Sequence, residues 1–283
     1  MASYLAFSEY INLYMEKSDL NPSKKKKKMI ARLGIGTKGV VYLLIGGLTA
    51  WAALGSGGKK TGSKGAFQFL LGQPFGQVML WLVVIGLAGY VFWRMYQTFM
   101  DPEDNGLDRK GLRRRLSYFS SGFFYLFIIY SAVQLLIGAG GGGSGGGKES
   151  MIQKLLNQEY GRWMVAAVAL IFLGKAIYQM FIAYSGNFKI KIKEAGMNNK
   201  TQQLMIYSGR VGYTARGLVV GIIAYLTVRA AITYDASKSG GTEDAFNFIQ
   251  DEFGAIVLGI IAFGMLAYGL FIMIKASEHK MNF

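Results

Sequence analysis

Long apolar runs alternate with shorter polar segments along the chain. Each run holds the ~20 residues that a helix needs to cross the hydrocarbon core of a bilayer. The pattern therefore predicts an all-α, polytopic membrane protein with six transmembrane helices. We place their approximate limits at 33–54, 75–98, 116–138, 161–184, 211–232 and 254–276.

The apolar runs are grouped in pairs by a motif that occurs three times. Each copy has an arginine, a glycine seven residues later, and then the apolar run. The second run of each pair begins at an aromatic residue followed by glycine, at Phe75-Gly76, Tyr160-Gly161 and Phe253-Gly254. An internal period of this kind indicates tandem repeats. The first-run motif residues are Arg32 with Gly39, Arg115 with Gly122, and Arg210 with Gly217.

Each pair of runs predicts one helical hairpin. Because every copy starts on the same side of the membrane, the hairpins are parallel repeats related by an axis along the membrane normal. We therefore expect a pseudo-threefold bundle of six helices. The predicted divisions are an amphipathic and polybasic N-terminal segment (1–29), hairpin repeats at 30–100, 113–184 and 208–276, and a short tail (277–283).

Two kinds of short segment are expected outside the spans. A partly apolar stretch comes just before each second run, at 66–71, 151–156 and 245–250, and predicts a short helix at the outer surface. At the N-terminus, residues 1–20 are either an amphipathic helix on the membrane or a frayed coil.

Basic residues gather on one side of the predicted membrane. They are frequent before the first span, as in Lys24 to Lys28, and after the second and fourth spans, but sparse in the other three loops. Lys and Arg mark the cytoplasmic side of a membrane protein. We therefore expect both termini to be cytoplasmic.

The first repeat carries the sequences Gln73-Pro-Phe-Gly76 and Gly86-Leu-Ala-Gly-Tyr-Val-Phe-Trp-Arg-Met-Tyr-Gln97. Together with the arginine–glycine motif, these resemble the bacterial domain-of-unknown-function family numbered 1206. The resemblance covers residues 30–276 and is weaker in the second repeat, which lacks the proline and the Trp-Arg pair. It implies three consecutive two-helix repeats in a bacterial inner membrane, and it implies no catalytic residues.

Composition narrows the functional classes. The net charge is +15, but the basic residues adjoin apolar runs rather than line one polar helix face, so nucleic acid is not an expected partner. Cysteine is absent and His279, near the end, is the single histidine. Thiolate metal sites and histidine-based triads are thereby excluded. We expect neither a cofactor nor an enzymatic activity.

Charged residues within the predicted spans are basic only. All sixteen Asp and Glu residues fall outside the six spans, which argues against a proton- or sodium-coupled carrier. Lys38 and Arg216 hold matching places one residue before the repeat glycine, whereas Arg94 and Lys175 lie in second spans. Such cations either extend to headgroups at the interface or face inward.

If they face inward, these cations predict a basic cytoplasmic vestibule that holds an anion or an anionic lipid headgroup. Our leading hypothesis is a small channel or passive transport protein with this vestibule. The alternative is a non-catalytic scaffold or accessory subunit that binds anionic lipid, either as a homo-oligomer or with a membrane partner. The candidate anion- or headgroup-binding residues are Arg32, Arg115, Arg210, Lys38, Arg216, Lys175 and Arg94.

Overall fold

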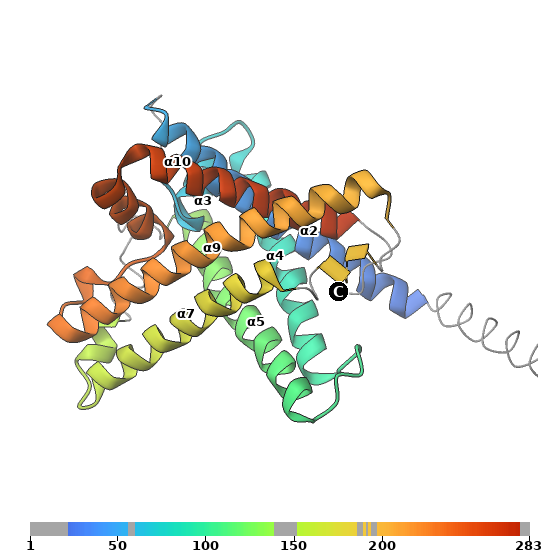
Figure 1. Cartoon of the computed structure of the whole chain (residues 1–283), viewed down its shortest axis with the longest axis horizontal. Coiled ribbons are helices and arrows are strands. Elements are labelled where there is room, and N and C mark those ends of the chain that lie inside the picture. Colours follow the sequence, from blue (N-terminus) through green and yellow to red (C-terminus); the bar gives the residue numbers. More distant parts are fainter. Residues whose placement is uncertain are drawn as a thin grey trace, which may run out of the picture.

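Long helices make up nearly all of the computed structural model, which describes residues 22–55, 60–138, 152–185, 189–190, 192–193 and 197–277 (Figure 1). Six of these helices are long and apolar enough to cross a membrane, which confirms the predicted fold class. The predicted segment 1–20 and the tail beyond Ser277 lie outside the described residues. The six helices are α2 (Pro22–Ala53), α4 (Gly76–Phe99), α5 (Arg109–Leu136), α7 (Gly161–Tyr184), α9 (Asn199–Thr233) and α10 (Thr242–Ser277).

The first helix of each repeat extends beyond its predicted span on the side that carries most of the basic residues, which we call the basic side. Helix α2 starts with Pro22, a residue whose fixed φ and missing N–H suit the first helical position. Helix α5 is capped by the Asp108 carboxylate, which accepts from the Gly111 N–H at 2.9 Å. Asn198 caps α9 in the same way. Polar caps of this kind satisfy the first backbone N–H groups of a helix that begins where water replaces lipid.

Short helices form before the second spans, as predicted. They are α3 (Ser63–Leu71), residues 152–156, and the first turns of α10, which bend into the span at Gly254 with φ 82°. Phe67 and Phe246 from two of these helices are fully buried and belong to the hydrophobic core. These two helices therefore pack inward at the end of the bundle opposite the basic side, instead of resting only on the membrane surface.

Each first helix packs on the second helix of the repeat before it, and α2 closes the ring by packing on α10. Figure 1 shows α7 running alongside α9, and α10 alongside α2. At each of these interfaces the repeat glycine meets a methionine that lies 19 residues after the opening glycine of the second helix. These equivalent contacts confirm the pseudo-threefold arrangement. The pairs are Gly39 with Met273, Gly122 with Met95, and Gly217 with Met180.

Within the first and third hairpins, glycine permits the two helices to touch through their backbones. A Cβ on Gly34 would lie 2.3 Å from the Tyr90 backbone nitrogen, and one on Gly212 would lie 2.5 Å from the Tyr268 Cα. The two glycines hold the same place, two residues after the repeat arginine. Small residues allow this approach, which lets helices associate in lipid through close packing.

The second hairpin lacks these contacts. Ser117 stands where the other repeats have Gly34 and Gly212, and Ile171 stands where they have glycine ten residues after the opening glycine of the second helix. The backbones of α5 and α7 make no close approach like that of α2 with α4 or α9 with α10. In their most apolar windows, 17% of α5 and 22% of α7 is buried, against 39–56% for the other four spans. The two helices of the second hairpin thus lack the backbone contact that joins the helices of the first and third hairpins, and we call it the open hairpin.

A valine at the tight position should separate these two situations. We expect Gly34→Val to lower stability by about 1–3 kcal/mol, because its side chain has no space beside the Tyr90 backbone. The equivalent change in the open hairpin, Ser117→Val, should leave the melting temperature in detergent nearly unchanged, since Ser117 is exposed. Equal melting temperatures for both variants would contradict the packing described here.

Candidate functional site

A buried lysine lies at the centre of the bundle. The side chain of Lys38 is only 7% exposed, and its Nζ donates to the Tyr90 Oη at 3.3 Å. The same Nζ lies 4.9 Å from the ring centroid of Tyr90, 5.1 Å from that of Tyr125 and 5.9 Å from that of Tyr268. Because each repeat supplies one of these tyrosines, Lys38 sits close to the pseudo-threefold axis.

Arg216 repeats this arrangement in the third hairpin. Its Nη1 donates to the Tyr268 Oη at 2.8 Å, across the same 52-residue separation that joins Lys38 to Tyr90. Its guanidinium also lies 5.1 Å from the ring centroid of Tyr42. Aromatic faces attract cations strongly where water is excluded, and tyrosine hydroxyls add an acceptor. We call Lys38, Arg94, Arg216, Tyr42, Tyr90, Tyr125 and Tyr268 the axial cluster.

Arg94 connects the axial cluster to the basic side. Its Nε donates to the Tyr90 Oη at 3.0 Å and its Nη1 donates to the Gln97 Oε1 at 2.7 Å. The Gln97 amide in turn donates to Glu103, which also accepts from the Tyr118 hydroxyl at 2.8 Å. A carboxylate outside the spans therefore reaches the buried cations through one glutamine. Spacing alone did not reveal this link, because Glu103 lies in a loop.

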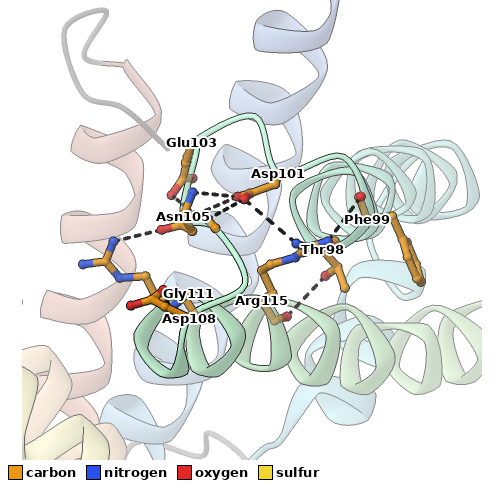
Figure 2. Close-up of polar contacts among 10 residues, drawn as sticks. Thr98, Phe99, Asp101, Glu103, Asn105, Asp108, Gly111 and Arg115 are labelled. Carbon is orange, nitrogen blue, oxygen red and sulfur yellow. Dashed lines mark hydrogen bonds and ion pairs between the residues drawn. The ribbon is translucent and has the colours of Figure 1, made fainter.

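Arg115 caps the end of the neighbouring second helix (Figure 2). Its Nε donates to the Thr98 carbonyl at 2.8 Å and its Nη2 donates to the Phe99 carbonyl at 3.3 Å. The last carbonyls of a helix have no partner within the helix and carry partial negative charge, so a guanidinium there is favourable. The Asp101 carboxylate forms an ion pair with Arg115 across 4.0 Å.

The loop beside this cap is held by Asp101. Its carboxylate accepts from the backbone N–H groups of Asn105 at 3.0 Å and Gly106 at 2.8 Å (Figure 2). Although desolvation acts in the opposite direction, these bonds and the nearby Arg115 hold the pKa of Asp101 below its usual value. The loop is therefore anchored by an ionised carboxylate.

Arg32 makes the equivalent cap in the first repeat, and Arg210 stands in the third. The Arg32 Nε donates to the Ala276 carbonyl at 2.8 Å, and Ala276 holds the same place in α10 as Thr98 holds in α4. The Arg210 Nε is buried and has no hydrogen-bond partner within the described chain. The three predicted rim arginines thus hold equivalent places, and two of them close the interfaces between repeats. Their binding of an anion stays a prediction.

Lys175 takes the place of a tyrosine in the second repeat. It lies 14 residues after the opening glycine of its helix, as Tyr90 and Tyr268 do in theirs. Its side chain is half-buried between α5 and α7, with Nζ 4.4 Å from the ring centroid of Phe124. Among the described residues it forms no hydrogen bond or ion pair through Nζ. The structure thus places this lysine beside the aromatic ring of the neighbouring helix, and its binding of an anion or a headgroup stays a prediction.

A groove of about 850 Å³ lies between α2, α4 and α10. Apolar side chains line most of it, and Arg32 and Ser277 lie at its end on the basic side. Gly36 contributes to its width, because a Cβ there would meet only the Ala276 Cβ, at 3.7 Å. The sequence could not reveal this groove, since it depends on how three helices are rotated. Within the described ranges, no group of three or more His, Asp or Glu residues is placed to hold a metal ion.

Removing one hydroxyl should test the axial cluster. Tyr90→Phe deletes the Oη that accepts from both the buried Lys38 and the half-buried Arg94, so both cations lose a partner. We expect a loss of about 1–3 kcal/mol in unfolding free energy, measured by denaturant titration in detergent. Tyr130→Phe is the matched control, because Tyr130 is 62% exposed on α5. A Tyr90→Phe protein as stable as the control would show that the hydroxyl does not stabilise the cluster.

Comparison with known proteins agrees with this architecture. The chain is 30% identical over 256 residues to "Uncharacterized protein YxxB" of Bacillus subtilis (strain 168). The aligned region covers 90% of this chain and 92% of the relative. No solved structure matches the chain. Residues 33–101, 116–186 and 211–277 each match the Domain of Unknown Function (DUF1206), one match for each hairpin. The chain therefore belongs to the DUF1206 family of three-repeat membrane proteins.

Proposed function

We propose that this membrane-embedded protein is a non-catalytic scaffold that binds an anionic phospholipid in the groove between α2, α4 and α10. The observation that carries the proposal is the groove itself, which is apolar along its length and has a guanidinium at one end. A phospholipid matches this groove, because it has apolar acyl chains along its length and a phosphate at one end. Arg32 uses Nε and Nη2 for its helix cap, and it still supplies positive charge at the groove's mouth.

The charge around the mouth supports an anionic headgroup. Five lysines, Lys24 to Lys28, directly precede in the sequence Met29, which lines the groove. Basic residues at a membrane surface each contribute about 1 kcal/mol to the attraction of anionic lipid. A zwitterionic lipid would gain much less from this position.

Packing on the axis favours the scaffold over the channel. Phe67 and Phe246 are buried in the core at the end of the bundle opposite the basic side, and tyrosines from all three repeats surround Lys38. A conducting pore needs a wettable path, whereas the ring centroids of Tyr90 and Tyr125 lie 4.7 Å apart and those of Tyr42 and Tyr268 lie 4.8 Å apart. The axial cations are therefore structural in this proposal, and they hold three repeats together by binding tyrosines from each.

Filling the groove should reduce lipid binding. Gly36→Leu would place a side chain in the groove without backbone conflict, and Gly47→Leu is the matched control, since its Cβ would likewise meet only an ordinary contact, 3.8 Å from Leu266. We expect purified wild-type protein and the Gly47→Leu variant to retain phosphatidylglycerol over phosphatidylcholine in native mass spectrometry. Gly36→Leu should lose at least about 1 kcal/mol of this preference, the scale of one basic contact.

The same proteins distinguish the alternatives. Retention of phosphatidylglycerol that Gly36→Leu leaves unchanged would place the lipid elsewhere and overturn the proposal. If inorganic phosphate were retained as strongly as phosphatidylglycerol in native mass spectrometry, the site would bind an anion without recognising acyl chains. Selective chloride or potassium flux in liposomes, absent from empty vesicles, would establish the channel instead of the scaffold.

Orientation is a separate prediction. We propose that the basic side faces the cytoplasm, where positive residues accumulate in membrane proteins. The chain has no cysteine, so single substitutions report cleanly. We expect Leu107→Cys, in the loop after α4, to react with a membrane-impermeant maleimide only after cells are permeabilised. Lys238→Cys, in the loop after α9, should react in intact cells. The reverse pattern would contradict the orientation.

A further inference from the structure

We propose that the exposed face of α5 and α7 binds a transmembrane helix of a different protein, and that a carboxylate on that helix pairs with Lys175. This surface belongs to the second hairpin and is distinct from the lipid groove, which is lined by α2, α4 and α10. The inference does not depend on the lipid-binding proposal.

The first step of the argument is the open hairpin. In the first and third repeats, glycine and tyrosine bring the two helices together, as at Gly34 with Tyr90. The second repeat has Ser117 and Lys175 at those places, and a large Ile171 that is 56% exposed. The two helices meet mainly through side chains, with the Phe124 and Phe172 ring centroids 5.7 Å apart. Much apolar surface of both helices is left available to a further helix.

The second step is the charge on Lys175. A cation within the membrane needs an anionic partner, interior water or a route to the interface. Tyr184, at the basic-side end of α7, is nine residues away, or about 14 Å along the helix. That distance places Lys175 near the middle of a hydrocarbon core of ~30 Å. A lipid phosphate stays at the surface, so it is not the natural partner at this depth.

The third step excludes a second copy as the source of the carboxylate. All sixteen Asp and Glu residues of this chain lie outside the apolar spans. A homodimer across this face would bring two lysines together and no acid at their depth. The complementary partner is therefore a transmembrane helix from another protein, with an Asp or Glu near its centre.

A defined probe helix can test this pairing. The probe is a synthetic leucine- and alanine-rich transmembrane helix with one central glutamate, and its control carries glutamine at the same place. The full chain carries a donor fluorophore on Gln158→Cys, an exposed position before α7, and the probe carries an acceptor. Binding is measured by energy transfer in phosphatidylcholine vesicles. We expect the glutamate probe to bind about tenfold more tightly than the glutamine probe.

Substitutions assign the effect to Lys175. Lys175→Met and Lys175→Tyr, the second of which restores the residue found in the other two repeats, should abolish the difference between the probes. Lys175→Arg should retain it. Lys275→Met, which removes a lysine from α10, should leave it unchanged.

Three results would overturn the proposal. The first is equal binding of the glutamate and glutamine probes to the wild-type chain. The second is an undiminished preference in Lys175→Tyr, since that variant keeps the fold of the sister repeats. The third is energy transfer between two copies of the chain that is lost in Lys175→Met, which would make a second copy the occupant.

Discussion

Close approach between helices is the constraint on which this bundle depends. Lipid supplies no hydrophobic force that drives one apolar helix against another, so helices in a membrane associate through tight packing and polar contacts. The repeat glycine provides that packing at three equivalent places, opposite Met273, Met95 and Met180. Gly34 and Gly212 add backbone contact within two of the hairpins. The positions of the axial cations, the helix caps and the groove all follow from these contacts.

Positive charge is accommodated in the bundle almost without acids. Lys38 and Arg216 are held by tyrosine faces and hydroxyls, and Arg115 is held mainly by carbonyls at the end of α4. Both solutions use groups that are already present in helices or aromatic side chains. Neither places a second formal charge in the membrane, whose transfer from water costs several kcal/mol. Glu103 is reached only through Gln97, at the edge of the span.

The span limits and the repeat were predictable because hydrophobicity and motif spacing are local properties of the chain. The pseudo-threefold ring was also predictable, since parallel repeats allow few other arrangements. The partners of the arginines were not, because they depend on helix rotation: Arg32 meets a carbonyl 244 residues away in the sequence. The same reason hid the groove beside Gly36 and the contact between Arg94 and Tyr90. That Lys175 and Tyr90 hold equivalent positions in the repeat was visible in the sequence once the opening glycines were aligned.

The covalent joining of three hairpins has a consequence for how such a protein can specialise. Three separate copies of one hairpin, assembled as a trimer, would share every residue, so that a lysine in place of tyrosine would appear at all three positions at once. A single chain frees each copy to change alone. Here the first and third repeats keep the tyrosine that binds the cations, while the second repeat has Lys175 in its place. Duplication within one gene thus separates the residues that maintain the assembly from those that are free to acquire a new task.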